Sequence, residues 1–261
     1  MARAEPPAWY VISLRPQGGH GPMRRAAARH GAGVIPLSPW RLQRCDDAGA
    51  RAALEAALVA PKVVFTSPEA VRAAAALQGF RARPGQHWLA VGAGTSRALA
   101  RAGVDDVQVP HRMDSEGLLA MPALQSQALS GQSVGLVTAP DGRGLLAEAL
   151  RGRGADVLRA DVYRRLPLAL SSAALARLRA LKAPAWMALS SGGALQQVLA
   201  SLPADLRARV LALPAAAASE RLQGFAQAAG VARVVVAEGP AARQLVDAMV
   251  AASTSESTAG L

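Results

Sequence analysis

The chain has 261 residues, of which 51% are hydrophobic, so it can bury one large core or two of ordinary size and is too apolar to be disordered. Lys and Arg outnumber Asp and Glu by 29 to 18, and the net charge of +11 favours anionic ligands. The single Cys45 excludes a disulfide framework and a thiolate metal cluster, and no apolar run is long enough for a signal peptide or a membrane span, so a soluble cytoplasmic protein is expected.

Short apolar runs alternate along the chain with amphipathic stretches rich in Ala, Leu and Arg. Strands are predicted at 9–14, 33–37, 62–66, 87–91, 107–109, 133–138, 156–162, 185–190, 209–213 and 233–237. Helices are predicted at 21–30, 46–59, 69–78, 95–102, 115–129, 142–152, 171–181, 193–201, 219–229 and 240–251. This alternation predicts βαβ units and parallel sheets, followed by a disordered tail at 253–261.

The two halves of the sequence repeat one another weakly. The stretch 15–37 resembles 138–162, because each reads as a Gly/Pro loop, an Arg-bearing helix, Gly-Ala and a strand. VVFTSPEAV at 63–71 resembles MALSSGGAL at 187–195 in the same way. Ten strands in two sets of five predict two similar open α/β domains, and chain order alone would divide them near residue 130.

Hydroxyl and glycine residues recur where a predicted strand gives way to a helix. The first N–H groups of a helix have no intrahelical partner and carry partial positive charge, so Ser or Thr can cap them or they can bind an anion. In parallel α/β domains these junctions lie at the carboxyl ends of the strands, where ligands bind. The candidate ligand-binding residues of this kind are Thr66, Ser67, Gly92, Thr95, Ser96, Ser190, Ser191, Gly192 and Ser219. Plain helix capping is the alternative at each junction.

Two of these junctions are close to known enzyme motifs. GAGTSR at 92–97 approximates the dinucleotide fingerprint, but Arg97 occupies the third glycine position, where close packing needs no side chain. ALSSG at 188–192 approximates a nucleophile elbow, in which the triad histidine follows the serine. All four histidines precede Ser190, at His20, His30, His87 and His111. A nicotinamide site and a hydrolase are therefore disfavoured, and no P-loop or zinc motif is present.

Taken in order, these segments resemble the uroporphyrinogen-III synthase family. The matching segments are LRP (14–16), VFTSPEAV (64–71), LAVGAGTSRALARAG (89–103), SEGLLAMPAL (115–124), GRGLLAEALRGRGADVLRADVYRR (142–165), ALSSGGAL (188–195) and ASERLQGFAQAAGVARVVVAEGPAARQLVDA (218–248). Together they span about 9–250. One departure is the stretch LPAAAAS at 213–219, which keeps only Ser219 where the family has glycine and paired hydroxyls.

The resemblance implies a fold of two similar, open, flavodoxin-like parallel-sheet lobes, joined by two extended linkers and with a cleft between them. It places 1–38 with 164–261 in one discontinuous lobe and 41–162 in the other. It also implies a monomer that uses no cofactor or metal. The expected partners are a linear tetrapyrrole and, in transient contact, the upstream deaminase, with no membrane and no nucleic acid.

The resemblance further implies a reaction. Hydroxymethylbilane loses water, its terminal D ring is inverted, and the macrocycle closes to uroporphyrinogen III. Tyr163, in the VYRR segment, is the candidate general acid, because its phenol is protonated at neutral pH. Arg15 and Arg143 are the candidate ligands of the substrate carboxylates. Alternatively, Tyr163 is a structural residue whose ring packs at the linker and whose hydroxyl bonds to the backbone. Each arginine could equally be an ordinary surface residue or a contact between the lobes.

Two other classes of function fit parts of the pattern. A non-catalytic, two-lobed receptor for a small polyanion would explain the repeated junctions and the charge, but it would not need the VYRR segment. A nucleic-acid-binding protein would explain a pI of about 11.4. The basic residues are dispersed and not interleaved with aromatics, however, which disfavours that class.

Overall fold

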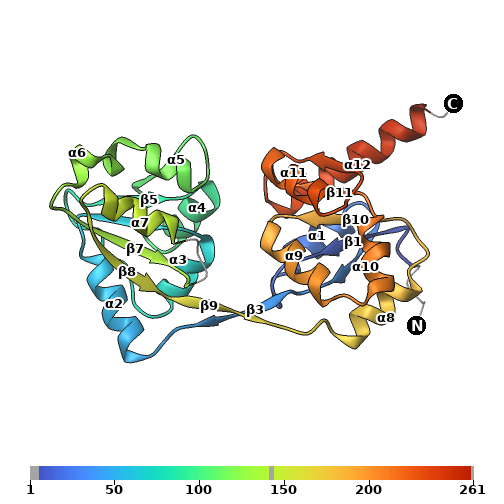
Figure 1. Cartoon of the computed structure of the whole chain (residues 1–261), viewed down its shortest axis with the longest axis horizontal. Coiled ribbons are helices and arrows are strands. Elements are labelled where there is room, and N and C mark those ends of the chain that lie inside the picture. The colour runs from blue at the N-terminus through green and yellow to red at the C-terminus, as the bar shows by residue number, and fades with distance from the viewer. Residues whose placement is uncertain (1–5, 141–143, 260–261) are drawn as a thin grey trace. The chain divides into compact units, whose positions relative to one another are not determined.

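The computed structural model describes residues 6–140 and 144–259, and it consists of two compact units. Unit 1 comprises Met1–Arg41 and Leu166–Leu261, and unit 2 comprises Leu42–Arg165. Each unit contains a five-stranded parallel sheet with helices on both faces (Figure 1). This arrangement confirms the predicted α/β class with two parallel-sheet lobes.

The sheet of unit 1 has the strand order β12-β11-β10-β1-β2. Its strands are β1 (Trp9–Ser13), β2 (Ala32–Pro36), β10 (Ala185–Leu189), β11 (Ala215–Ala217) and β12 (Val234–Val236). Its helices are α1 (Gly21–Ala28), α8 (Ser172–Ala180), α9 (Gly192–Ser201), α10 (Ala204–Leu211), α11 (Glu220–Ala228) and α12 (Ala242–Ala259). Counted along the chain within the unit, the order from the β2 edge is 2-1-3-4-5, that of flavodoxin-like sheets.

Side chains of the central strand β10 alternate between two cores, because successive residues of a strand point to opposite faces. Met187 and Leu189 pack on the side of α8 to α11, whereas Trp186 and Ala188 pack on the side of α1 and α12. All five residues of β10 are buried, as expected for a central strand covered on both faces.

The sheet of unit 2 has the strand order β6-β5-β4-β7-β8. Its strands are β4 (Lys62–Phe65), β5 (His87–Ala90), β6 (Val107–Gln108), β7 (Ser133–Thr138) and β8 (Asp156–Asp161). Its helices are α2 (Ala48–Leu58), α3 (Pro68–Ala75), α4 (Ala93–Arg101), α5 (Ser115–Ala120), the 3-10 turn η1 (Pro122–Leu124), α6 (Ser126–Leu129) and α7 (Leu145–Gly152). Helices α2, α3 and α4 cover one face of the sheet, and α5 to α7 cover the other.

The two sheets are related by a circular permutation. Starting unit 2 at β7 and reading from the β8 edge gives β8-β7-β4-β5-β6, which is again order 2-1-3-4-5. In this correspondence β7-α7-β8 matches β1-α1-β2, and β4-α3 matches β10-α9. These are the segments whose sequences repeat one another, so the repeats occupy equivalent places in the two sheets.

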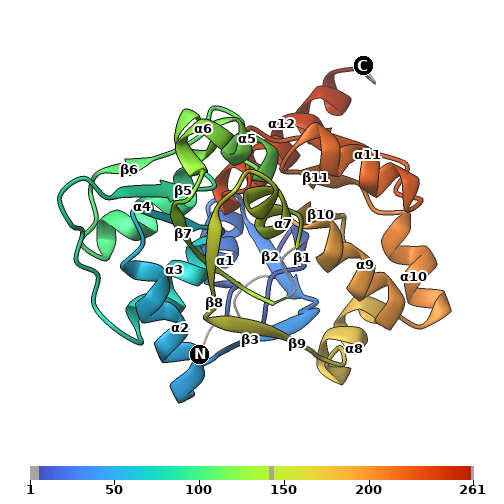
Figure 2. The ribbon, with the colours of Figure 1, turned by 60° about the vertical axis from the view of Figure 1, so that its left-hand side comes forward.

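The chain passes between the units twice, in β3 (Trp40–Arg44) and β9 (Tyr163–Pro167). These segments are the extended linkers, and they pair side by side as a two-stranded sheet (Figures 1 and 2). Their flanking residues bond as well, since the amide of Cys45 donates to Val162 O (3.0 Å) and the amide of Leu168 donates to Pro39 O (3.1 Å).

The predicted strand at 209–213 is wrong. Most of that stretch belongs to α10, and the strand at this place in the sheet is β11, Ala215–Ala217. Leu206 and Val210 of α10 are buried one helical turn apart, so the helical period decides this segment. Three alanines have little intrinsic strand propensity, and β11 forms because it pairs with strands on both sides.

The predicted helix at 115–129 is broken into α5, η1 and α6. Met121 is extended at the end of α5 and Pro122 follows, as expected because proline disfavours a helical residue before it. Helix α12 extends to Ala259 and so includes most of the segment 253–261 that is predicted to be a disordered tail. The hydroxyls of Ser253 and Thr254 donate back to carbonyls of the preceding turn, which is compatible with a continuing helix. Among the described residues, no helix is long and apolar enough to cross a membrane.

Candidate active site

The order 2-1-3-4-5 creates one topological switch point in each sheet. There, neighbouring strands send their chains to opposite faces, leaving a crevice at the carboxyl ends where ligands of open α/β sheets bind. The switch point lies between β1 and β10 in unit 1 and between β7 and β4 in unit 2. We call the loops that follow these and the adjacent strands the rim of each unit.

The rim of unit 2 contains a hydroxyl pair across its switch point. Thr66 follows β4 and Thr138 ends β7, and Thr66 Oγ1 donates to Thr138 Oγ1 (2.8 Å). Thr138 is buried and Thr66 is half-buried. Because the Thr66 hydroxyl donates its proton to Thr138, it can only accept a hydrogen bond from a ligand. The Thr138 hydroxyl keeps its own proton and can donate it to a ligand.

Ser67 connects the first turn of α3 to Tyr163. The amide of Ala70 donates to Ser67 Oγ (3.0 Å), which is an N-cap, and Ser67 Oγ lies 3.2 Å from the Tyr163 hydroxyl oxygen. The Tyr163 side chain is only 4% exposed and packs in the core under α2, α3 and α4. Tyr163 is the first residue of the linker strand β9. Nothing in the sequence indicates that Ser67 holds its hydroxyl.

Helix α4 begins on the rim of unit 2, directly after β5. Gly92 is its N-cap, and the amides of Thr95 and Ser96 donate to Gly92 O (2.9 and 3.1 Å). Thr95 is buried and Ser96 is half-buried. The exposed Met113 lies over this glycine, and a Cβ there would come within 3.0 Å of the Met113 Cβ atom, which explains the absence of a side chain.

In unit 1, serines cap both rim helices that follow β10 and β11. Ser191 Oγ accepts from the amide of Ala194 (3.3 Å), and Ser219 Oγ accepts from the amide of Leu222 (3.3 Å). Ser190 is exposed beside the first cap. Gly192 opens α9 against the ring of Phe225, whose nearest carbons would lie 3.2 Å from a Cβ at that position.

Arg15 follows β1 at the switch point of unit 1. Its Nη2 donates to Pro240 O (2.9 Å), while its Nε is buried and has no hydrogen-bond partner. Among the described residues, no carboxylate lies within ion-pair distance of it. Desolvation lowers the pKa of Arg15. A desolvated cation without a counter-charge is costly, so this side chain is ready to accept an anion. Arg143, the other candidate, lies outside the described residues.

His20 belongs to the same rim, although the sequence gives it no function and disfavours it as a triad histidine because it precedes Ser190. Its Nδ1 lies 2.9 Å from Ser13 Oγ and its Nε2 lies 2.9 Å from Ser38 Oγ. Burial, assisted by the charges of Arg24 and Arg15, lowers the pKa of His20 to about 4. The imidazole is therefore neutral at pH 7. No sequence pattern marks this contact, because its three residues lie in a strand, at a helix start and between β2 and β3.

The pKa of His20 predicts a pH dependence of stability. Between its ordinary pKa of 6.5 and its folded value of about 4, the unfolded chain binds a proton that the folded chain excludes. The free energy of unfolding should therefore fall as the pH decreases from 6.5 to 4, by up to about 3 kcal/mol from this residue. Urea denaturation of the wild type and His20→Gln across this range measures the difference. The matched control His87→Gln, at an exposed histidine bonded to Gln108, should keep the wild-type dependence.

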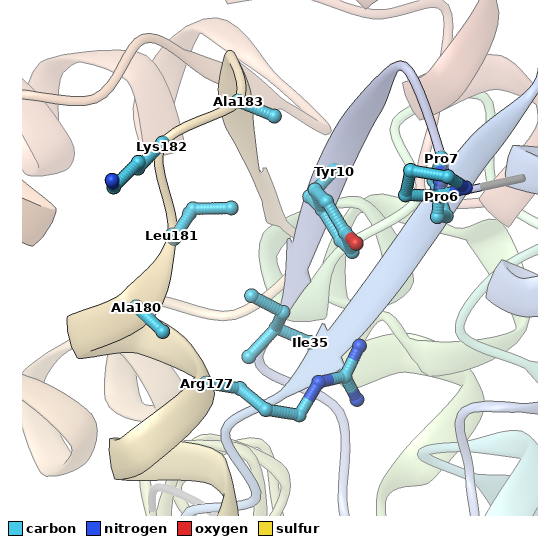
Figure 3. A pocket seen from close by; sticks show the side chains of 9 residues that line it. All are labelled: Pro6, Pro7, Tyr10, Ile35, Arg177, Ala180, Leu181, Lys182 and Ala183. Atoms are coloured by element: carbon cyan, nitrogen blue, oxygen red, sulfur yellow. The ribbon is translucent and has the colours of Figure 1, made fainter.

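A separate pocket of about 370 Å³ lies in unit 1 between α8 and the strands β1 and β2 (Figure 3). Tyr10, Ile35 and Leu181 form its apolar part, and the Arg177 side chain extends beneath Ile35 while Lys182 points away from Tyr10. None of the candidate site residues lines it.

The chain is similar to one known protein family and to several solved structures. The model of the uroporphyrinogen-III synthase HemD family matches residues 22–247. A mutant uroporphyrinogen III synthase from the bacterium Thermus thermophilus is 18% identical, with 94% of this chain and 99% of that chain covered and a TM-score of 0.63. The wild-type protein in another crystal form is 19% identical, with 95% and 98% covered and a TM-score of 0.53. The uroporphyrinogen-III synthetase of Helicobacter pylori is 14% identical, with 93% and 98% covered and a TM-score of 0.57. These likenesses show the fold, and the family model matches most of the chain, so the chain belongs to the uroporphyrinogen-III synthase family.

Proposed function

We propose that this chain carries out the reaction of its family, the cyclisation of hydroxymethylbilane to uroporphyrinogen III, by holding the substrate carboxylates at its two rims. The observation that carries this proposal is Arg15, a desolvated guanidinium at a switch point with no carboxylate partner among the described residues. An acetate or propionate of the substrate supplies the missing charge, in a geometry that a guanidinium binds well.

The other rim residues act as weaker anchors. Ser190, Ser191, Gly192 and Ser219 in unit 1, and Gly92, Thr95 and Ser96 in unit 2, lie at helix starts, where N–H and hydroxyl groups are available. Thr66 takes part through Thr138, because the Thr66 hydroxyl donates to Thr138 and leaves the Thr138 proton for a ligand. Each helix start contributes about 0.3–1 kcal/mol to anion binding, so many contacts are needed to hold a flexible polyacid. Arg143 is proposed as a further ligand on the basis of the sequence alone. As a set, these contacts order the two ends of the substrate for reaction. A single contact that is made equally in the ground and transition states contributes to binding alone.

Tyr163 is proposed as the general acid. Its phenol donates a proton to the hydroxyl of the substrate, and the C–O bond breaks. The hydroxyl departs as water, and the substrate becomes an azafulvene cation. A pyrrole carbon of the D ring then attacks this cation, and rearrangement with loss of a ring proton completes the inverted macrocycle, with the proton returning to the phenolate through solvent. Ser67 supports this role, because its hydroxyl is fixed by the Ala70 amide and lies 3.2 Å from the Tyr163 oxygen. In this arrangement Ser67 orients the phenol and can donate to the phenolate.

We further propose that the chain works as a monomer in the cytoplasm and meets the upstream deaminase transiently. The family resemblance supports the monomer and the contact, since the deaminase releases a substrate that closes without catalysis. The single Cys45 supports a reducing compartment.

The test of this function is a coupled assay that starts from porphobilinogen and the deaminase. The products are oxidised, and the type III and type I isomers are separated. We expect type III to dominate when the protein is added and type I to dominate in its absence. Binding of the substrate with no change in isomer would identify the polyanion receptor instead, and the proposal would fail.

A further inference from the structure

The loop that carries Arg15 leaves β1 and returns to α1 within a few residues. Gly18 has a φ of +81°, and the amide of Gly19 donates to Pro16 O (2.9 Å), so the loop is a tight turn. Glycine is needed at the positive φ, because other residues rarely adopt that conformation. The loop closes on His20, the N-cap residue of α1.

The imidazole of His20 connects this loop to two neighbouring segments. Ser13, at the end of β1, bonds one ring nitrogen, and Ser38, just after β2, bonds the other. Ser13 is fully buried and His20 is 7% exposed. A neutral imidazole has one donor and one acceptor nitrogen, so it can satisfy both bonds, with one serine accepting and the other donating. A second connection ties the loop to the linker, since the amide of Gln17 donates to Trp40 O (2.9 Å).

The guanidinium of Arg15 depends on this loop for its position. Its one hydrogen bond is from Nη2 to Pro240 O, which leaves the rest of the fork without a protein partner among the described residues. The turn folds back toward Arg15, because the Gly19 amide bonds to the carbonyl of the next residue, Pro16, and a Cβ added at Gly19 would lie 3.8 Å from the Arg15 Cβ atom. A shift of the turn would therefore move the root of the Arg15 side chain directly.

We propose that His20 is a positioning residue for substrate binding, which bridges Ser13 and Ser38 and thereby aims the Arg15 guanidinium at a substrate carboxylate. This inference rests on the proposed role of Arg15 as a carboxylate ligand. It assigns a function to a buried histidine that takes no part in the proton transfer. It also distinguishes His20 from a residue that merely fills space, because its effect must pass through Arg15.

The test is a double-mutant cycle on steady-state kinetics, with His20→Phe as the disrupting variant and Arg15→Gln as its partner. Phenylalanine fills the site but cannot bond to either serine. We expect His20→Phe to raise KM about tenfold with kcat changed less than about twofold, since misplacement of a ligand held equally in ground and transition states affects binding alone. In the Arg15→Gln background, His20→Phe should have no further effect on KM.

Two further variants keep the test decisive. Ser38→Ala removes one bond without disturbing the buried ring and should raise KM in the same direction by about threefold, so the proposal remains testable even where His20→Phe fails to fold. His87→Gln, at an exposed histidine outside the rims, should keep the wild-type KM.

Several results would overturn the proposal. An equal rise of KM in the wild-type and Arg15→Gln backgrounds would show that His20 acts independently of Arg15. A wild-type KM in folded His20→Phe and Ser38→Ala would show that the bridge has no role. If Arg15→Gln itself keeps the wild-type KM, both this inference and the binding role of Arg15 fail. The reaction is tested separately, by formation of type III product with the wild-type protein.

Discussion

Replacement of Tyr163 by phenylalanine is expected to slow turnover by roughly 10²–10⁴-fold, the usual contribution of a general acid. The ring packs in the core of unit 2, and phenylalanine keeps that packing while removing only the hydroxyl at Ser67. The measurement is single-turnover formation of type III product by Tyr163→Phe, with folding checked by thermal denaturation.

The second tyrosine of the chain provides a matched control. Tyr10 lines the pocket between α8 and the sheet of unit 1 and is not a candidate site residue (Figure 3). Tyr10→Phe removes the same atom and should leave turnover within about twofold of the wild type. A loss below about fivefold in Tyr163→Phe would instead assign Tyr163 an orienting or structural role.

Replacement of Gly135 by alanine is expected to destabilise unit 2 strongly. Gly135 lies in the middle of β7, where the backbone of α2 crosses the strand. A Cβ at this position would lie 1.9 Å from Ala57 O, so the helix would have to move away from the sheet. Overpacking of a core costs about 1–3 kcal/mol, and a backbone clash should reach the top of that range or exceed it. Because Thr138 ends the same strand, rim function should be lost together with stability.

Denaturant unfolding of Gly135→Ala measures this cost. The control is Gly79→Ala, at a glycine with no atom within 4 Å of a Cβ and no positive φ, which should leave the stability within about 0.5 kcal/mol of the wild type. Equal stabilities of the two variants would contradict the packing of α2 on β7.

The class of the fold and the positions of the rim residues follow from local sequence patterns. Strand–helix alternation predicts parallel sheets, and parallel strands bring their carboxyl ends to one edge, so the sequence alone places Thr66 and Gly92 on a common rim. Local patterns do not say which strands pair. Chain order suggests a division near residue 130. In the structure, Tyr10 of β1 pairs with Ala185 of β10, so strands from both sides of that division belong to one sheet.

The contacts that set the geometry of the site could not be predicted from local patterns. Ser67 and Tyr163 are 96 residues apart, and Ser38 reaches His20 only because β2 returns beside β1. The strand β11 escaped prediction for a related reason, since its three alanines become a strand through pairing and not through propensity. The family resemblance implies the reaction, and the structure supplies the contacts on which the proposed roles of Arg15 and His20 depend.

The central claim is that both rims hold carboxylates of one tetrapyrrole, and affinity for the type III product tests it most directly. Titration calorimetry under anaerobic conditions would compare the wild type with Arg15→Gln in unit 1, Ser96→Ala in unit 2, and Arg177→Gln as a charge-matched control away from both rims. We predict that Kd rises about tenfold or more for Arg15→Gln and about two- to tenfold for Ser96→Ala, while Arg177→Gln stays within about twofold. Equal weakening by Arg15→Gln and Arg177→Gln, with no effect of Ser96→Ala, would show that the product is attracted by net charge alone and would contradict the claim.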